Sequence, residues 1–455
     1  MDRLDYSPTD AIAALSTPWG QSALAAVRVS GPGSLALLAP LFSPAAALRA
    51  APGHGAVHGH LLDPARGGER IDEVLLVVYR APRSFTGEEG AEIFTHGSPV
   101  IVRRVLDTLN RSGFRPAGPG EFTLRAFLNG KLDLTQAEAV NELVRARTDR
   151  ARALALHRLG GSIEGRVRAL AGRLLEFLAA VEVSLDYPDE ELPAELPARP
   201  ELEAFQAELE ALAGTYRIGR LIQEGVSAVL AGRANAGKST LFNRLLREER
   251  AIVSEEPGTT RDYLEGGLSL EGVPVRLFDT AGYREGGGEV EAEGQRRTDA
   301  LVDSSQLVLY LVDAAGGLAP EDRRFLSERG RDGRLIAVWA KSDLARSPAP
   351  EGFLAVSAAT GQGVEELCRL MAERVLEGAE SGDGEAVVDS LRQKQLLDRS
   401  LESFREFRRG LEAGLALDLL AVDLREALEA LGEITGQVSS QDILSAIFSR
   451  FCVGK

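Results

Sequence analysis

The segment 232–239 constrains the fold of this chain more than any other part of the sequence. It reads GRANAGKS, fits the pattern G-x-x-x-x-G-K-[ST], and directly follows the apolar run Val226–Ala231. Its glycines allow backbone N–H groups to turn toward a phosphate at a helix N-terminus, where the helix dipole favours anions. Lys238 is expected to bridge the β- and γ-phosphates, and Ser239 to bind Mg²⁺. The segment predicts a strand, a phosphate loop and a helix in succession.

Apolar runs with the length of strands recur between residue 226 and about residue 377, and helical or loop stretches separate them. Such alternation is typical of a mostly parallel sheet with helices on both faces. We therefore predict an α/β domain in this region. The runs that we expect to form its strands are Val226–Ala231, Val273–Phe278, Leu307–Val312, Leu335–Ala340 and Phe353–Val356.

Further segments follow the phosphate loop in the order that a guanine-nucleotide site requires. Gly258–Asp262 is a candidate switch segment, in which Thr260 would close on Mg²⁺ and the γ-phosphate. Asp279–Gly282 follows a predicted strand and places a carboxylate beside the metal. Asp343 follows the next strand but one, and its carboxylate can accept hydrogen bonds from guanine N1–H and the guanine amino group. With Ser357–Ala359 as a base-contacting loop, these segments predict a GTPase.

Two positions depart from the usual pattern of such sites. Ala340 stands where guanine-binding loops normally carry Asn, whose side chain would bond the base and brace the phosphate loop. We expect selectivity for GTP over ATP to persist through Asp343, with a weaker affinity. Tyr283 stands where Ras-like enzymes carry a water-orienting Gln, so a different catalytic arrangement is required.

Asn235 and an acidic segment are candidates for that arrangement. The side-chain oxygen of Asn235 is suited to hold a monovalent cation beside the phosphates, which would supply the charge of an arginine finger. A carboxylate from residues 286–293 would then position the water. Glu289, Glu291 and Glu293 are all candidates, and chemistry alone does not choose among them. A solvated loop accounts for these acids equally well.

The composition of the chain limits its expected partners and cellular location. Its 455 residues predict two or three domains, and 68 acidic against 52 basic side chains give a net charge of −16. Contact with nucleic acid must therefore rely on local basic patches. The N-terminal residues lack the pattern of a secretion signal, no apolar run is long enough to cross a bilayer, and two Cys exclude a disulfide scaffold. We expect a cytoplasmic protein that does not span a membrane.

The histidines and cysteines have ordinary interpretations. Gly53–His60 contains alternating His, and the alternation favours an edge strand over a metal site. Cys368 lies in a helical run and is expected in a core. For Cys452, a nucleophile is one interpretation, but we favour a buried thiol because no His is near it in the sequence.

The regions that flank the predicted α/β domain differ from it in the pattern of their apolar residues. Residues 1 to about 125 mix short β-like runs with Gly- and Pro-rich loops, which indicates a compact α/β or α+β unit. Helical spacing begins near Leu132, a further amphipathic stretch is expected at Glu201–Ile222, and helical segments are expected again at Leu391–Leu431 and Asp442–Phe451. The Pro-rich segment 187–200 interrupts this helical pattern. The simplest organisation is an α/β domain inserted into a helical domain.

Together with the nucleotide motifs, several segments make the chain resemble the MnmE (TrmE) family of tRNA-modification GTPases over essentially its whole length. They are Arg28–Gly31, Ser84–Glu88, His96–Gly97, Pro119–Leu134, the phosphate loop and Phe451–Lys455. The resemblance implies a multidomain fold of α/β and α parts. It would comprise an N-terminal tetrahydrofolate-binding and dimerisation domain of α/β type (1–127), a helical domain (128–222 plus 379–455) and an inserted Ras-like P-loop GTPase domain (223–378).

The resemblance also implies the residues of the nucleotide site. The family's water-positioning Glu aligns with Glu291, which would be the catalytic residue. Ser239 and Thr260 would bind Mg²⁺, while Asn235, Ser254, Glu256 and Thr259 would hold K⁺. The implied GTP-binding residues are Asn235, Ala236, Gly237, Lys238, Ser239, Thr240, Ser254, Glu255, Glu256, Pro257, Gly258, Thr259, Thr260, Asp279, Thr280, Ala281, Gly282, Lys341, Asp343, Ser357, Ala358 and Ala359.

The resemblance also implies a folate-binding site formed by Arg28, Glu92, Lys131 and Lys455. Without the resemblance, each of these residues is more often a surface charge. Glu92 suits the N–H edge of a pterin, and Lys131 or Arg28 suits the glutamate tail. The implied cofactor is a tetrahydrofolate derivative, either 5-formyl or 5,10-methylene.

The resemblance finally implies a reaction and its partners. A homodimer would work with the flavoprotein MnmG on carbon 5 of the wobble uridine of certain tRNAs, installing an aminomethyl or carboxymethylaminomethyl group. The Arg-rich 141–173 is the candidate tRNA surface, with a solvated helix face as the simpler interpretation. A GTPase switch in ribosome assembly or signalling is the alternative function. The folate motif and Lys455 distinguish the two, because a simple switch has no reason to carry them.

Overall fold

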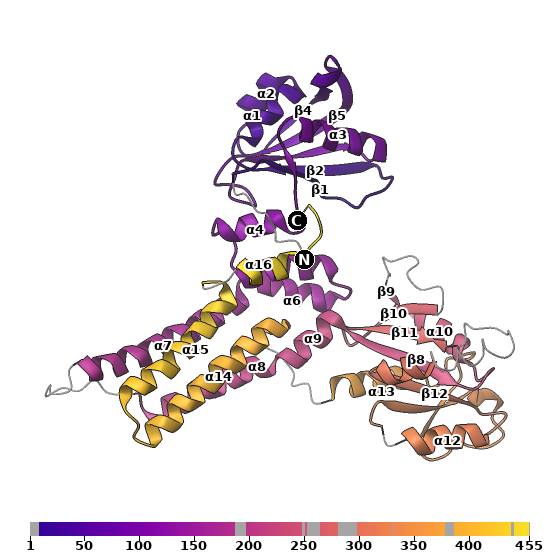
Figure 1. Ribbon diagram of the computed structural model, residues 1–455. Coiled ribbons are helices and arrows are strands. Elements are labelled where there is room, and N and C mark those ends of the chain that lie inside the picture. Colours follow the sequence, from indigo (N-terminus) through magenta and orange to yellow (C-terminus); the bar gives the residue numbers. More distant parts are fainter. Residues whose placement is uncertain are drawn as a thin grey trace. The chain divides into compact units, whose positions relative to one another are not determined.

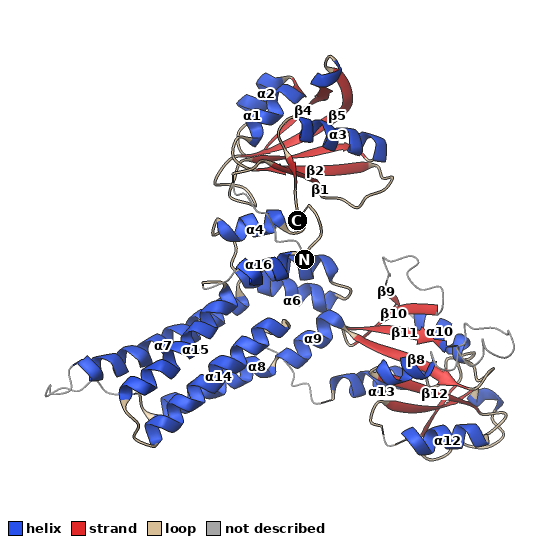
Figure 2. Ribbon diagram, viewed as in Figure 1, coloured by secondary structure: helices blue, strands red, loops and turns tan. Residues whose placement is uncertain are grey.

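The computed structural model describes residues 9–186, 197–247, 251–252, 264–280, 298–330, 332–377, 386–437 and 441–454. The chain divides into two compact units. The first comprises Met1–Asn141, Arg158–Gly172 and Leu428–Lys455, and the second comprises Glu142–His157 and Arg173–Ala427. Figure 2 shows that both combine helices and strands, as predicted. Within these described ranges, no helix has the length and apolar character needed to cross a bilayer.

The first unit contains a seven-stranded sheet among its described residues. All neighbouring strands pair antiparallel except β1 and β7, which are parallel. The register places Arg28 of one strand opposite Glu92 of the next. In spatial order the strands are β3 (Phe42–Ser43), β4 (Gly55–Asp63), β5 (Glu69–Tyr79), β6 (Gly90–His96), β2 (Leu24–Ser30), β1 (Ile12–Leu15) and β7 (Arg115–Pro116).

Helices cover one face of this sheet (Figure 1). Strand residues such as Val27 and Ile93 alternate with more polar ones, and they pack against Leu38, Leu48 and Val105 of the helices. Arg28 and Glu92 therefore lie on the opposite face, which leaves them free to form a site. The covering helices are α1 (Ser34–Leu38), α2 (Ala45–Ala50) and α3 (Pro99–Arg111), with the 3₁₀ turns η1 (Ala39–Leu41) and η2 (Pro64–Arg66) between strands.

The histidine-containing segment forms β4, which pairs with the two-residue β3 on one side. Most of β4 is consequently an edge strand, as the alternation predicted.

The C-terminal residues return to the N-terminal part of the first unit. Leu124, Leu134 and Phe448 form a small core, contributed by α4 (Glu121–Leu128), α5 (Leu134–Arg145) and α16 (Gln441–Phe448). The N–H of Gly120 donates to the carbonyl of Cys452 at 3.3 Å. The prediction that Cys452 is buried is wrong, because the tail lies on the surface beside Pro119 and leaves this thiol exposed.

The second unit contains another seven-stranded sheet in its described part. All five predicted strands are present, and they pair parallel. The sequence analysis missed β9 and β10, which extend the sheet antiparallel. In spatial order the strands are β14 (Phe353–Val356), β13 (Leu335–Ala340), β12 (Leu307–Asp313), β8 (Val226–Gly232), β11 (Val273–Asp279), β10 (Leu264–Leu270) and β9 (Ala251–Ile252).

Helices lie on both faces of this sheet because its central strands are apolar on both sides. On one face, Phe242 of α10 (Lys238–Arg247) and Met371 of α13 (Val364–Leu376) join the core, where Cys368 is buried as predicted. On the other face, Tyr310 stacks on Phe325 of α12 (Pro320–Arg329), with ring centroids 4.1 Å apart. The turn η4 (Ser342–Leu344) follows β13.

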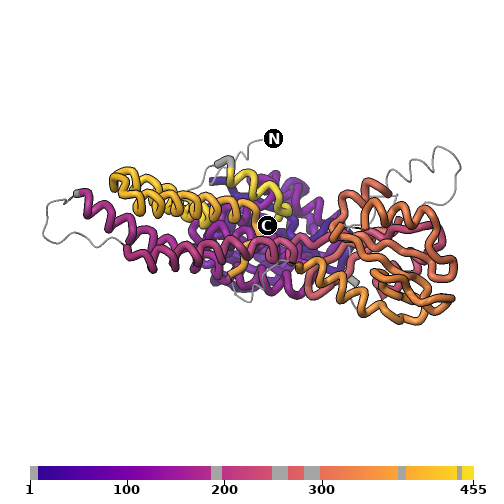
Figure 3. Tube along the Cα trace, turned by 90° about the horizontal axis from the view of Figure 1, so that it is seen from below, coloured from indigo at the N-terminus to yellow at the C-terminus, as the bar shows by residue number. Residues whose placement is uncertain are grey.

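The helical part of the second unit has an aromatic core. Phe205 and Phe404 lie with ring centroids 4.5 Å apart, and Phe177 and Phe407 pack against Phe404. Helices α8 and α14 run side by side and antiparallel (Figures 1 and 3), with an ion pair between Arg405 and Glu210 at 2.6 Å. The helices of this part that lie wholly within the unit are α8 (Arg199–Gly214), α9 (Tyr216–Glu224) and α14 (Leu391–Glu412), whereas α6 (Asp149–Leu159), α7 (Ser162–Asp186) and α15 (Leu417–Thr435) are divided between the two units.

Two of the stretches predicted to be helical each contain two helices. The stretch 201–222 divides into α8 and α9 at Thr215, and 391–431 divides into α14 and α15. In the second case Gly414 has φ of +68°, a left-handed conformation that ends the helix.

The helical part also contacts the turn that joins β10 to β11. The Thr148 hydroxyl donates to the carbonyl of Gly272 at 2.7 Å, and the Arg150 guanidinium donates to the carbonyl of Glu271 at 3.1 Å. Gly272 has φ of +78°, and a Cβ atom there would lie 2.7 Å from the Arg150 side chain. The backbone of this turn is therefore held by side chains from the connection between α5 and α6 and from the start of α6.

We predict that Phe404→Ala lowers the free energy of unfolding by about 3–5 kcal/mol, because the ring is fully buried among other rings. Leu175→Ala, at a side chain that is 56% exposed, is the control and should change it by less than about 0.5 kcal/mol. Urea unfolding followed by circular dichroism measures both variants. Equal stability of the two variants would contradict this account of the core.

Candidate functional site

The parallel strands of the second unit end at one edge of their sheet. Gly232 of β8 pairs with Leu311 of β12, and Asp313 at the end of β12 pairs with Ala340 at the end of β13. Asp279 ends β11 beside the same strand β8. The phosphate loop, the Asp279 segment and the Lys341 segment are thereby brought to one edge, where α/β proteins commonly bind ligands.

The phosphate loop has the backbone conformation that an anion site needs. Gly232, Asn235 and Gly237 all have positive φ, at 135°, 62° and 98°. A Cβ atom on Gly232 would lie 2.3 Å from the carbonyl oxygen of Leu311, so only glycine fits there. Helix α10 begins at Lys238, directly after the loop. Backbone N–H groups and a helix N-terminus together favour a bound phosphate.

Lys238 lies inside this loop with 6% of its surface exposed. Its ammonium donates to the carbonyls of Gly232 and Arg233 at 2.7 and 2.8 Å. Burial lowers the pKa of Lys238, while the charge of Asp279 acts in the opposite direction. A poorly hydrated ammonium among backbone carbonyls is suited to exchange these contacts for phosphate oxygens.

The other predicted residues around the loop occupy defined positions. Ala236 is buried, Ser239 is half-buried and Thr240 is exposed, the last two in the first turn of α10. Asp279 is fully buried, and the hydroxyl of Thr280 donates to the carbonyl of Leu230 at 2.8 Å.

Lys341 and Asp343 lie on the side of the site predicted for the base. The ammonium of Lys341 donates to the Asp313 carboxylate at 2.6 Å, and its stem passes within 3.8 Å of the Cβ position on Gly237. Asp343 is exposed, which leaves its carboxylate accessible to a base. Buried Ser357 accepts a hydrogen bond from the N–H of Thr360 at 3.2 Å, which shapes the loop that carries Ala358 and Ala359.

Asp313 was not predicted as a site residue. Hydrogen bonds and the charge of Lys341 outweigh the effect of partial burial and lower the pKa of this carboxyl group. Its position at the end of a predicted strand, on the same edge as Asp279, was the available signal. Ala340, buried beside it, has only a methyl side chain and cannot hydrogen-bond to the loop, whereas Lys341 and Asp313 form an ion pair there.

Several predicted site residues lie outside the described residues, so their positions carry no argument. They are Ser254, Glu255, Glu256, Pro257, Gly258, Thr259, Thr260, Ala281, Gly282, Glu291 and Lys455.

The first unit contains a separate pocket with a volume of about 360 Å³. Arg28, Tyr79, Phe85, Glu88 and Glu92 are among the side chains that line it. The guanidinium of Arg28 donates twice to Glu92 Oε1, at 2.7 and 3.1 Å, and the Tyr79 hydroxyl donates to Glu92 Oε2 at 3.3 Å. Burial, followed by the Glu92 charge, raises the pKa of Tyr79, so the phenol remains a donor at neutral pH.

The pocket brings two of the four predicted folate residues into contact. Arg28 and Glu92 form its ion pair. Lys131 donates to the carbonyl of Pro82 at 3.3 Å, and its stem lies beside Gly87 in the loop that carries Phe85. The carbonyl of Gly454 accepts a long hydrogen bond from Arg28 at 3.5 Å, so the C-terminal tail also reaches this region.

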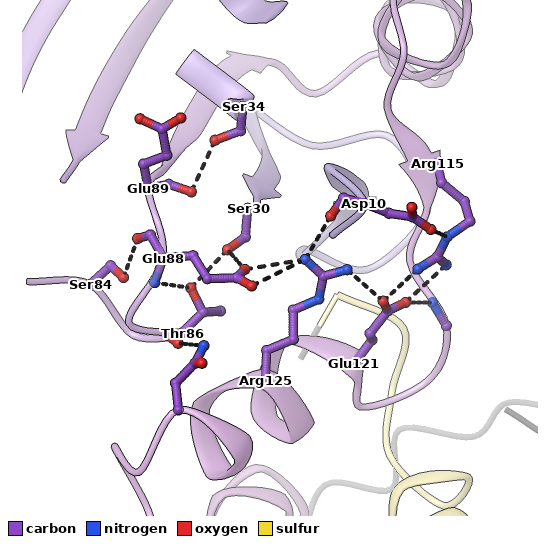
Figure 4. Close-up of polar contacts among 12 residues, drawn as sticks. Asp10, Ser30, Ser34, Ser84, Thr86, Glu88, Glu89, Arg115, Glu121 and Arg125 are labelled. Carbon is purple, nitrogen blue, oxygen red and sulfur yellow. Dashed lines mark hydrogen bonds and ion pairs between the residues drawn. The ribbon is translucent and has the colours of Figure 1, made fainter. Parts of the chain in front are cut away.

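A buried polar network lies behind Glu88, one of the side chains that line the pocket (Figure 4). Arg125, which is fully buried, donates to Glu121, to Glu88 and to the carbonyl of Asp10. Arg115 donates to both carboxylate oxygens of Glu121, to Oε1 at 2.6 Å and to Oε2 at 3.1 Å. Sequence reasoning gave neither Glu88 nor Arg125 a role, although both lie in the segments that carry the family resemblance.

Comparison with known proteins identifies the family. A family model described as the MnmE helical domain matches residues 134–452, and one described as the GTP-binding protein TrmE N-terminus matches residues 11–131. The tRNA modification GTPase MnmE of Symbiobacterium thermophilum is 43% identical over 463 residues, covering 98% of this chain and 99% of that protein. The chain belongs to the MnmE family of tRNA modification GTPases. The family inferred from the sequence is thus confirmed.

Other relatives of this MnmE family member were also found. The tRNA modification GTPase MnmE of Borrelia recurrentis is 39% identical over 467 residues and covers 100% of both chains. Among solved structures, the G domain of the T. maritima FeoB iron transporter is 25% identical, with a TM-score of 0.25, and covers 33% of this chain and 98% of that one.

We predict that Ala340→Asn strengthens GTP binding by about 2- to 10-fold, because one added hydrogen bond contributes about 0.5–1.5 kcal/mol. Titration calorimetry with GTP measures the change, and ATP serves as the control nucleotide, for which no gain is expected. An unchanged GTP affinity would show that the ion pair between Lys341 and Asp313 already replaces the missing Asn.

Proposed function

We propose that this chain is a potassium-dependent GTPase that acts with the flavoprotein MnmG on the wobble uridine of certain tRNAs. It would install an aminomethyl or carboxymethylaminomethyl group at carbon 5, with a tetrahydrofolate one-carbon unit as the source of the bridging methylene. The observation that carries the proposal is the presence of two separate built sites in one MnmE-family chain. One is the phosphate loop of β8 and α10, and the other is the pocket around Arg28 and Glu92.

In the nucleotide site, Lys238 and the backbone of residues 235–240 would hold the phosphates of GTP. Asp343 would accept from guanine, and Lys341 would pack over the phosphate loop. Ser239 and Thr260 would hold Mg²⁺, with K⁺ held by Asn235, Ser254, Glu256 and Thr259. Bound cations would supply positive charge against the charge that develops on the phosphates. Glu291 would position the attacking water.

In the pocket of the first unit, Arg28, Glu92, Lys131 and Lys455 would bind the folate. The pocket is large enough for a pterin ring, and its aromatic side chain Phe85 and paired charges suit a flat heterocycle with polar edges. The bound cofactor would supply the one-carbon unit. We propose that residues 1–127 form this folate-binding domain and also the homodimer contact.

The remaining proposals concern organisation. Residues 128–222 with 379–455 would form the helical domain, and 223–378 the inserted GTPase domain. The protein would act in the cytoplasm, with tRNA and the flavoprotein as its partners.

We predict that GTP hydrolysis falls when K⁺ is replaced by Na⁺. Glu291→Ala should bind GTP with unchanged affinity but hydrolyse it about 10²–10⁴-fold more slowly, because a positioned base is lost. Glu293→Ala is the matched control and should keep its rate. Phosphate release in the two salts measures these effects, and equal rates in both would eliminate the cation role of Asn235.

We also predict that a strain lacking this protein has wobble uridines without the carbon-5 substituent. Mass spectrometry of nucleosides from purified tRNA measures this, with the complemented strain as the control. Fully modified tRNA in the deletion strain would favour the alternative, a GTPase switch in ribosome assembly or signalling.

A further inference from the structure

The first unit contains a second pocket, with a volume of about 450 Å³, between β1, α3 and the C-terminal tail. Most of its wall is apolar, with contributions from Leu15, Leu106 and Phe114. Its volume is in the range of sites that bind a small molecule or a single ring system. The polar groups that line it decide which ring fits.

Two polar side chains of α3, Asp107 and Asn110, line this second pocket. They are three residues apart, so they lie on the same side of the helix. In the part of the chain that the structure describes, neither side chain has a hydrogen bond or an ion pair, whereas the neighbouring Arg111 binds Asp63 at 3.0 Å. A carboxylate and an amide are therefore available to a ligand that carries N–H groups.

An exposed tryptophan completes the second pocket. Trp19 lies in the loop between β1 and β2, lines the pocket and is 55% exposed. The other tryptophan of the chain, Trp339, is buried. An accessible indole beside an apolar pocket is suited to stack on a flat ring, and nucleobases bind proteins in this way.

The free carboxylate selects among the nucleobases. Guanine presents its N1–H and its amino group side by side, and one carboxylate can accept from both. Adenine has no N1–H, and uracil carries a single N–H between two carbonyls that a carboxylate repels. Asp107 therefore favours guanine. Arg103, one turn earlier on α3, is exposed and has no ion-pair partner among the described residues, so it is available to a phosphate.

Strand β1 and the tail connect the second pocket to the pocket around Arg28. Ala14 lines the second pocket and pairs across the strands with Arg28, about 5 Å away as paired strand residues are. Val453 also lines the second pocket, and the carbonyl of the next residue, Gly454, accepts from Arg28 at 3.5 Å. A polymer with one unit in the second pocket can thus bring a neighbouring unit toward the first, which a free nucleotide cannot do.

We propose that the second pocket binds an unpaired guanine base of RNA. The base stacks on Trp19 and donates its N1–H and amino hydrogens to the carboxylate of Asp107, while Arg103 contacts the RNA backbone. The inference deepens the proposed function and rests on it, because tRNA is the substrate there. The second pocket anchors the RNA beside the proposed folate site.

Tryptophan fluorescence locates the base. The full-length protein, with its nucleotide site filled by GDP, is titrated with a short RNA hairpin that carries one guanine among uracils in its loop. Stacking should quench the emission of Trp19, and Trp19→Phe, which keeps only the buried Trp339, should show no quenching. Guanosine monophosphate should quench only at concentrations about 100-fold higher or more, because it lacks the neighbouring units of the RNA.

Fluorescence anisotropy of labelled hairpins tests base recognition. Asp107→Asn should weaken binding of the guanine hairpin by about 10- to 100-fold and keep an adenine hairpin within about twofold, because only guanine loses hydrogen bonds to a charge. Loss of a negative charge alone would instead strengthen binding of every RNA. Trp19→Ala should weaken both hairpins by about 5- to 100-fold. Glu176→Gln, at an exposed acid of α7 in the second unit, is the charge control and should change neither.

Each other outcome overturns a defined statement. Equal changes for the two hairpins in Asp107→Asn would overturn guanine recognition. Unquenched Trp19, with unchanged affinity in Trp19→Ala, would show that RNA binds elsewhere, and the proposed function would stand without this pocket. Equal quenching by guanosine monophosphate would make the occupant a free nucleotide. Wild-type protein that binds neither hairpin would overturn the inference, and the wobble uridines of the deletion strain would then decide whether the proposed function fails with it.

Discussion

The buried guanidinium of Arg125 is the interaction on which the first unit depends most. An unpaired charge in such a place would cost several kcal/mol, and the structure offsets this cost by surrounding the guanidinium with Glu121, Glu88 and a backbone carbonyl. Hydrogen bonds from Arg115 and Gly118, with the charges of both arginines, outweigh burial and lower the pKa of Glu121. The network joins the start of β1 and the Glu88 loop to α4. It thereby positions the wall of the pocket as well as the helix.

The second unit builds its site at the ends of its strands, where the backbone of the phosphate loop surrounds the buried Lys238 and Asp279 lies buried nearby. Four parallel strands end at one edge, so the loops that follow them converge without any long-range polar network. The strand β11 connects this edge with the helical part of the unit. Asp279 ends β11 at the nucleotide edge, while Gly272 precedes β11 and accepts the hydrogen bond from Thr148. One seven-residue strand thus separates the candidate catalytic edge from the helical contact.

The sequence predicted those features that local patterns determine. Strands such as β13 are apolar on both faces, and the same residues mark them in the sequence and the structure. β10 reads LEGGLSL. Its glycines and its charged residue interrupt the run of apolar residues by which the other strands were predicted. Lys394 forms an ion pair with Asp398 one turn along α14, a contact between neighbours in the sequence.

Features that depend on distant segments were not predictable from local patterns. Exposure of Cys452 follows from the course of the tail past Pro119, more than 300 residues earlier in the chain, a separation that spacing arguments cannot bridge. The contact of Glu88 with Arg125 likewise joins residues from a loop and a helix that only the fold brings together. The sequence motifs mark both segments, but only the structure shows that they are in contact.

The central claim is that the nucleotide site and the pocket of the first unit serve one reaction. The most direct measurement is the level of carbon-5 modification at wobble uridines in a deletion strain that expresses either Lys238→Ala or Arg28→Ala. Our account predicts that both strains lack the modification, although purified Arg28→Ala still binds GTP and purified Lys238→Ala still binds folate. Full modification in either strain would contradict the claim.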